Sequence, residues 1–142
     1  GWHLGEHSIW GKHALFEESL HSPLIIHHPG IKQAGKPTTS MVETLDIFPT
    51  LCELAGLKKP EHAQGVSLVP ILKNPNAPGH DAFAYRRNAR TVRTSTHRLI
   101  AHKDGYSELY DHRTNAGETN NIAGENPALV KELRAKIAVR LD

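Results

Sequence analysis

The residues whose types and spacing could do chemistry gather near the start of this chain. Lys12 follows a tryptophan and a glycine in a segment rich in glycine and histidine, and His3, His7 and His13 lie around it. A fixed ammonium in a dry pocket offsets the negative charge that builds up on oxygens when an anionic group is transferred. For a lysine without further context, an ordinary surface position is the simpler interpretation.

The histidines raise the alternative of a zinc site, which their spacing does not favour. His3, His7 and His13 are separated by three or more residues inside a glycine-rich loop, without a cysteine or a His-Glu-x-x-His pattern. That is a weak metal signature. For His7, hydrogen bonding to the backbone of the loop and contact with a substrate stay open alternatives.

Two further candidates, Cys52 and the pair Glu17-Glu18, are better explained by structural positions than by catalytic roles. Cys52 is the only cysteine, so it excludes an internal disulfide, and its neighbours are typical of an amphipathic helix in which it is buried. Glu17 and Glu18 are paired carboxylates, as general acid–base chemistry requires, but adjacent residues of a helix do not face each other. We therefore expect them on a solvated face.

The first half of the chain predicts two elements. Residues 24–28 are an apolar run between two prolines, which predicts a strand buried in a parallel sheet. Residues 46–56 predict a helix, with Asp46 as its N-cap and Gly56 as its stop. Its apolar face is expected to pack against the sheet and consists of Leu45, Phe48, Cys52 and Ala55.

The second half of the chain has a residue pattern that is typical of short strands followed by a helix. Residues 82–85, 91–101 and 108–110 are strand-like, and Asp104-Gly105 is typical of a hairpin turn. Asn126-Pro127 predicts the start of a closing helix. The apolar stripe of that helix is formed by Leu129 or Val130, Leu133, Ile137 and Leu141.

Four sequence blocks together resemble the second half of a sulfatase. Leu-Gly-Glu-His followed by Gly-Lys in residues 4–12, and Asp-Ile-Phe-Pro-Thr-Leu in residues 46–51, match family patterns. Residues 65–72 and 108–123 match two more, in the family's order. Trp2 and residues 21–29 favour the iduronate-2-sulfatase-like branch.

The resemblance implies an α/β fold, namely the C-terminal portion of an alkaline-phosphatase-like sulfatase. Residues 1–79 would be the end of the large catalytic domain. Residues 80–142 would form a small α+β C-terminal subdomain, a short antiparallel sheet with a helix.

The resemblance also implies the site. Lys12 would contact the sulfate as a catalytic residue, and His7, His13 and His3 would be substrate-binding residues. The family's Asp-His pair, in which the Asp binds calcium and the His contacts the sulfate ester, is expected immediately before Gly1, so no metal ligand is expected in this chain. The formylglycine nucleophile is expected upstream as well, because Cys52 lacks the Pro and Arg of its motif. The chain alone is therefore predicted to be inactive.

The expected partners are a sulfated saccharide and the rest of the same polypeptide. A net charge of +2 gives no reason to expect nucleic acid, and no apolar run is long enough for a membrane span. By resemblance alone, a periplasmic or secreted location is expected. Two alternatives stay open: a phosphodiesterase or phosphonate monoester hydrolase of the same superfamily, and a non-catalytic module that binds anions through the arginines of residues 86–93.

Overall fold

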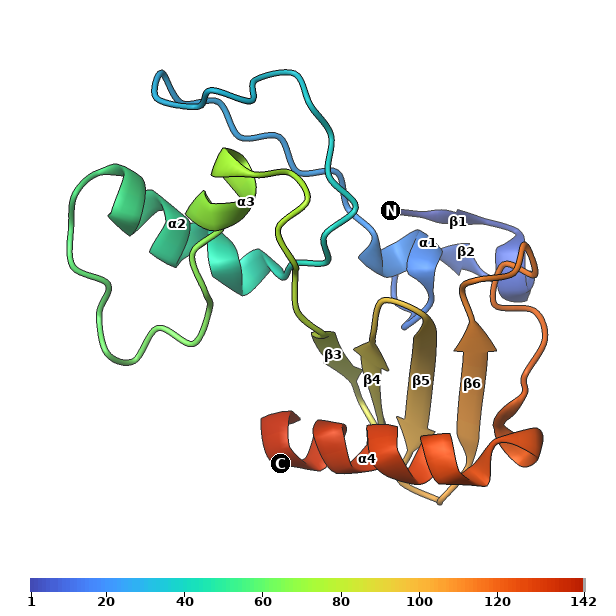
Figure 1. Ribbon diagram of the computed structural model, residues 1–142. Helices are drawn as coiled ribbons and strands as arrows, with labels where there is room; N and C mark the ends of the chain where they lie inside the picture. Colours follow the sequence, from blue (N-terminus) through green and yellow to red (C-terminus); the bar gives the residue numbers. More distant parts are fainter. Residues whose placement is uncertain (142) are drawn as a thin grey trace. The chain divides into compact units, whose positions relative to one another are not determined.

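A computed structural model describes residues 1–141 of the chain (Figure 1). These residues form two compact units: unit 1 combines residues 1–24 with residues 83 onward, and unit 2 comprises residues 25–82. The expected domain boundary between residues 79 and 80 refers to the intact protein and stays a prediction. None of the described helices is long and apolar enough to cross a bilayer.

Unit 1 is built on a four-stranded sheet in the order β3-β4-β5-β6. The strands are β3 (Ala82–Arg86), β4 (Ala89–Arg93), β5 (His97–His102) and β6 (Ser107–Asp111). β5 pairs antiparallel with β4 and with β6. Because β5 is central, five of its six residues are buried, and successive side chains point to opposite faces. Leu99 faces one hydrophobic cluster and Ile100 the other.

Helix α4 (Pro127–Leu141) covers one face of this sheet (Figure 1). The predicted stripe is confirmed: Leu133 and Ile137 are buried in a cluster with sheet residues, and Leu129, Val130 and Leu141 pack against it. The helix begins at Pro127 as expected. The Asn126 side chain, however, donates to the carbonyl of Ile122 at 3.0 Å, so it closes the preceding turn.

The turn between β5 and β6 was also predicted correctly. Gly105 has a φ of 94°, a left-handed conformation that favours glycine. Asp104 Oδ1 accepts a hydrogen bond from the amide of Tyr106 at 3.0 Å. The Asp-Gly pair forms this turn through contacts within a few residues, so the sequence alone was enough to predict it.

The other elements of unit 1 come from the first residues of the chain. β1 (His3–Leu4) and β2 (Trp10–Gly11) form a short antiparallel pair around the 3₁₀ turn η1 (Glu6–Ser8). Helix α1 (Glu17–Leu20) follows, and the turn η3 (Ala123–Glu125) precedes α4. Leu15, just before α1, is buried with Ile100 and Tyr110, on the face of the sheet opposite α4.

Unit 2 contains η2 (Thr44–Asp46), α2 (Ile47–Leu54) and α3 (Val69–Lys73). The predicted helix is confirmed, and Gly56 ends it with a φ of 68° while the amide of Leu57 bonds back to the carbonyl of Cys52 at 2.8 Å. The predicted apolar face is only partly correct. Cys52 is buried, but Leu45 and Phe48 are half exposed, and Pro49 and Thr50 are buried instead.

Asp46 occupies the N-cap position of α2 as expected, but its side chain makes no capping bond to that helix. Its carboxylate serves other partners: the amides of Glu43 at 2.7 Å and Val66 at 2.9 Å, and the His80 ring at 2.8 Å. The expectation of a strand in this region is wrong. Residues 24–28 form no strand, and Ile25 is 92% exposed. A strand requires a hydrogen-bonded neighbour, and residues 1–141 contain none for this segment.

Candidate functional site

The two histidines at the start of the candidate loop pack onto α1. His3 is fully buried, and its Nε2 lies 2.9 Å from Ser19 Oγ. The His7 ring stacks on Phe16 with centroids 3.8 Å apart, and its Nε2 lies 3.5 Å from Glu18 Oε2. The two rings meet edge-on at 5.8 Å. Both therefore fix the loop on the helix.

Lys12 and His13 lie on the exposed segment that leads from β2 to α1. Gly11 precedes them with a φ of 151°. Within residues 1–141, neither side chain has a hydrogen bond or an ion pair. Ala14 and Leu15, which follow directly, are buried. The ammonium of Lys12 is thus held near a packed segment yet available to an anion.

A charged network that the sequence did not predict joins α1 to the sheet. Arg98 on β5 is only 2% exposed, and its Nε donates to Glu118 Oε1 at 2.6 Å. Its Nη2 donates to Glu17 on α1. His112 Nε2 approaches the same Glu118 oxygen at 2.6 Å, and Arg93 Nε lies 3.5 Å from Glu17 Oε2.

The expectation of a solvated Glu17–Glu18 face is therefore wrong. The cause is the burial of Leu15 and the packing of Phe16 against the same cluster, which bring Glu17 to the arginines of the sheet. Glu18 lies beside His7 instead. Glu118 lies inside residues 108–123, a block that matched the family pattern, and this match was a signal in the sequence for a role of Glu118. Its partner Arg98 is 20 residues away and no local pattern links the two.

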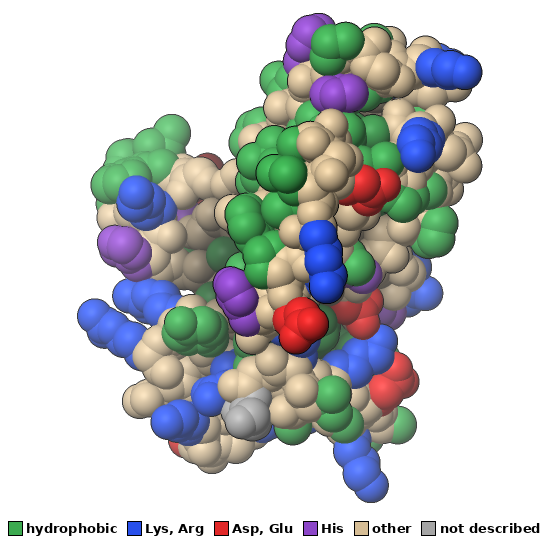
Figure 2. All heavy atoms as spheres, turned by 90° about the vertical axis from the view of Figure 1, so that its left-hand side faces the viewer, with side chains coloured by type: hydrophobic (Ala, Val, Ile, Leu, Met, Phe, Trp, Pro, Cys, Tyr) green, Lys and Arg blue, Asp and Glu red, His purple; other side chains and the backbone are tan. Residues whose placement is uncertain are grey.

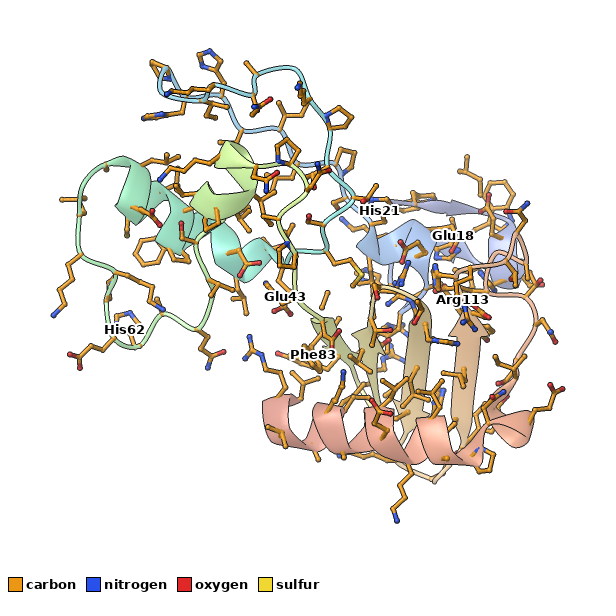
Figure 3. All side chains as sticks on the ribbon, viewed as in Figure 1. Glu18, His21, Glu43, His62, Phe83 and Arg113 are labelled. Atoms are coloured by element: carbon orange, nitrogen blue, oxygen red, sulfur yellow. The ribbon has the colours of Figure 1, made fainter. Side chains whose placement is uncertain are left out.

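The network borders a cavity of about 310 Å³ in unit 1. Glu18 on α1 and Arg113 just beyond β6 mark this end of the sheet in Figure 3. The residues that line the cavity are Glu17, Glu18, His21, Asp111, His112, Thr114, Gly117 and Glu118.

Two acidic residues of the cavity, Asp111 and Glu118, have lowered pKa values. Burial alone would raise the pKa of Glu118, but hydrogen bonds and charges from His112 and Arg98 outweigh it, so its pKa is lowered. Hydrogen bonds from Arg113 hold the pKa of Asp111 well below its usual range. The cavity thus presents ionised carboxylates that already have cationic neighbours.

These side chains do not fit the calcium that the resemblance to sulfatases implies. Two sets bring ligand atoms within 4.8 Å of one another: His7, Glu18 and Glu118, and Glu17, His112 and Glu118. Calcium takes about six to eight oxygen ligands, whereas each set offers three atoms, one of them a nitrogen. Glu118, common to both, is already paired with Arg98. We assign no metal to these side chains.

The fold defines the class of protein. The chain shares the α/β fold of alkaline-phosphatase-like sulfatases, with 30% identity and a TM-score of 0.84 to BT4656, solved in complex with its substrate D-glucosamine-2-N,6-O-disulfate. That match covers 97% of this chain and 31% of BT4656. A phosphonate monoester hydrolase from Silicibacter pomeroyi is also similar, with 25% identity and a TM-score of 0.78 over 93% of this chain and 31% of that one.

The particular family follows from sequence. The model of the family described as N-sulphoglucosamine sulphohydrolase, C-terminal, matches residues 5–142. The chain belongs to this sulfatase family, which confirms the resemblance to sulfatases. The iduronate-2-sulfatase-like branch stays a prediction.

Curated relatives agree with this assignment. Arylsulfatase K of Mus musculus is 34% identical over 93% of the chain, and the delta 4,5-hexuronate-2-O-sulfatase of Bacteroides thetaiotaomicron is 32% identical over 84%. The chain spans only 27% and 28% of the lengths of these two relatives.

Proposed function

We propose that the intact protein hydrolyses sulfate esters and that this chain supplies the C-terminal part of the enzyme. The observation that carries the proposal is the family match over residues 5–142, which includes the segment with Lys12. The sulfatase names of the curated relatives support it.

In the proposed reaction, Lys12 contacts the sulfate group. Sulfuryl transfer places negative charge on the equatorial and leaving-group oxygens, and a fixed ammonium stabilises that charge. The exposed, unpaired side chain of Lys12 supports this role, since it needs to break no interaction within residues 1–141 to meet an anion.

The histidines have different access to a substrate. His13 is exposed beside Lys12, so we propose that it contacts the substrate directly. His3 and His7 are occupied by Ser19, Phe16 and Glu18. They would bind the substrate only through edges of their rings that these contacts leave open.

We place the calcium ligands and the formylglycine in the part of the polypeptide outside this chain. When bound, calcium would hold sulfate oxygens and the formylglycine would supply the nucleophile. The poor fit of the acidic sets in unit 1 to calcium supports this placement. The residues of this chain then bind the sulfate through Lys12 and fix the geometry of the loop.

A sulfated saccharide is the proposed substrate. BT4656 was solved with a sulfated glucosamine, and one relative is named a hexuronate sulfatase. We also propose a periplasmic or secreted location, which rests on the family resemblance. Fractionation of the source cells, followed by immunoblotting, tests it, and a purely cytoplasmic signal would count against it.

The test of the function uses the purified intact protein with its formylglycine and calcium. Sulfate release from N-sulfated and O-sulfated glucosamine and from sulfated hexuronate disaccharides is measured by ion chromatography. We expect release from at least one of them. The similarity to a phosphonate monoester hydrolase favours one competing function. Faster hydrolysis of a phosphonate monoester than of every sulfate ester would establish that alternative.

A further inference from the structure

We propose that the buried ion-pair network around Arg98 and Glu118 positions Lys12 by holding the segment that carries it against the sheet. This inference rests on the proposed function, in which Lys12 contacts the sulfate. Arg98 and Glu118 are positioning residues, because they act on the reaction only through the segment that they hold.

Apolar packing holds the segment that carries Lys12 at a fixed distance from the sheet. Leu15, three residues after Lys12, is buried in a cluster with Ile100 and Tyr110. Phe16 packs against the same cluster. Such contacts are non-directional, so by themselves they allow the segment to slide or rotate on the sheet.

Directional bonds to Glu17 remove that freedom. The backbone amide of Glu17 donates to Glu118 Oε2 at 2.8 Å, and its carboxylate pairs with the guanidinium of Arg98. The main chain and the side chain of one residue are therefore both bound to buried groups of the sheet region. Charge-assisted hydrogen bonds of this kind are short and geometrically specific.

Glu118 is itself held in one orientation. Its other oxygen, Oε1, accepts from Arg98 and from His112, each at 2.6 Å. The residue is 5% exposed and has a φ of 59°, a left-handed conformation that is costly for a residue other than glycine. Such a backbone persists only where its surroundings over-determine it, and it often marks a functional site.

The loop on the other side of Lys12 is fastened to the same short helix. His3 lies beside Ser19, and His7 stacks on Phe16. Lys12 therefore lies between two points of attachment to α1 and its leading residue. Any shift of α1 on the sheet carries Lys12 with it, and a misplacement of about 1 Å can cost about 10²-fold in rate.

Stability alone is a weaker explanation of the network. Replacing a buried ion pair by apolar residues of similar volume is often neutral or stabilising. Arg98 makes one longer contact within the sheet, from its Nη1 to Thr91 Oγ1 at 3.4 Å. Its bonds to the two glutamates, and the bond between those glutamates, join the start of α1 to β5 and to the loop after β6. Their arrangement fits the control of geometry.

The test combines Glu118→Gln and Lys12→Ala in the intact protein, well below the melting temperature of each variant. We expect Glu118→Gln to lower kcat by about 10-fold or more, with a smaller rise in KM. If Glu118 acts through Lys12, adding Glu118→Gln to the Lys12→Ala variant should cost little further. Non-additivity of this kind is the signature of two residues that act on one step.

A matched arginine provides the control. Arg134 on α4 also makes several hydrogen bonds, to Ser107 and to the carbonyls of Gly105 and Tyr106, but none to α1. Arg98→Lys should lower kcat, whereas Arg134→Lys should lower the melting temperature and leave kcat unchanged. If Glu118→Gln fails to fold, Arg98→Lys tests the positioning role in its place.

The possible failures are distinguishable. An active wild type that needs Lys12 but keeps its kcat in Glu118→Gln and Arg98→Lys would overturn the positioning role alone. An equal loss from Glu118→Gln with and without Lys12 would do the same. An intact wild type that hydrolyses no sulfate ester would overturn the proposed function, and the inference with it.

Discussion

At the residue scale, Lys12 differs from the histidines around it in what it contacts. His3 and His7 are used to close the loop on α1, whereas Lys12 and His13 are exposed and without polar partners in residues 1–141. A residue that a fold positions through its neighbours, and leaves unpaired itself, is suited to bind a ligand.

Replacing Lys12 should therefore affect the reaction and not the fold. We expect Lys12→Ala in the intact protein to lower kcat for a sulfate ester by about 10²–10³-fold, because the charge on the sulfate oxygens loses a fixed donor. Steady-state kinetics check this. Lys36→Ala, on the exposed connection in unit 2, is the control and should keep wild-type rates. Wild-type kcat in Lys12→Ala would contradict the assignment.

The sequence predicts a site role for Lys12 because its distance from Leu-Gly-Glu-His resembles a local pattern of the sulfatase family. It did not identify the pair of Arg98 and Glu118, and it placed Glu17 on a solvated face. The hydrogen bond from Glu17 to Glu118 joins residues 101 positions apart. Contacts at such separations depend on how the sheet folds, which residue types along the chain do not reveal.

At the scale of elements, unit 2 depends on close approach of the backbone at Gly65. A Cβ at this position would lie 2.0 Å from the carbonyl oxygen of Leu45 and 2.8 Å from the amide nitrogen of Asp46. Both are backbone atoms of η2, directly before α2, so neither can move aside as a flexible side chain would. The adjacent residue Val66 donates its amide to the buried Asp46 carboxylate.

Gly65→Ala should destabilise unit 2. We expect a loss in the free energy of unfolding of about 1–3 kcal/mol or more, measured by urea denaturation of the intact protein or by hydrogen exchange in this region. Gly124→Ala is the matched control, because a Cβ there meets no atom within 4 Å and φ is not positive. That variant should change stability by no more than about 0.5 kcal/mol. Equal effects of the two substitutions would contradict the steric argument.

The same unit has a titratable link between Asp46 and His80. His80 Nε2 lies 2.8 Å from Asp46 Oδ2, and its Nδ1 lies 2.9 Å from the carbonyl oxygen of Asp81. Both neighbours are acceptors, so only the imidazolium satisfies both bonds. Burial lowers the pKa of His80, but these bonds and the charges of Asp46 and Glu43 outweigh it, so its pKa is raised above 6.5.

The bond between Asp46 and His80 should make unit 2 less stable as the pH rises through the raised pKa of His80. Because His80 binds its proton more tightly in the folded state, its contribution is complete below pH 6.5, its value in the absence of these contacts, and is lost as the pH rises through the raised pKa. Protection of the Val66 amide from hydrogen exchange, corrected for intrinsic rates, should fall over that range. His80→Gln should remove the dependence. Protection that rises with pH in the wild type would refute the link.

Helices were predicted better than the isolated strand. The periodic apolar residues of α4 and the stop at Gly56 act within a few residues, and both predictions were confirmed. The strand expected at residues 24–28 was wrong, because an apolar run forms a strand only beside a partner. Asp46 occupies the predicted N-cap position of α2 without capping that helix through its side chain. Its carboxylate binds the nearby amide of Glu43 and also Val66 and His80, 20 and 34 residues away.

At the scale of the whole molecule, unit 2 presents apolar surface. Leu45, Phe48 and Leu51 are each at least half exposed, at 50%, 51% and 56%. Figure 2 shows hydrophobic side chains grouped in its upper part, while Lys and Arg side chains are frequent in its lower part. Contiguous apolar surface of this kind marks regions that bind other protein. Since the relatives are more than three times as long, the rest of the polypeptide is the partner that we propose.

The isolated chain should therefore be catalytically inactive. We expect no sulfate release above background from residues 1–142, because we place the nucleophile and the metal ligands elsewhere in the polypeptide. The same assay on the intact protein provides the positive control. Turnover by the isolated chain, abolished by Lys12→Ala, would show that residues 1–142 carry a complete active site.

The network of Arg98, Glu118 and Glu17 also has a consequence for the order in which the chain folds during its synthesis. Residues 1–24 belong to one unit with the residues from Phe83 onward, and Glu17 can bond to Glu118 only after Glu118 has been synthesised. A ribosome that adds about 5–20 residues per second leaves the first segment without its docking surface for roughly 5–20 s. Unit 2 is contiguous in sequence and can fold in that interval, so we expect the segment that carries Lys12 to be among the last parts to reach its native position.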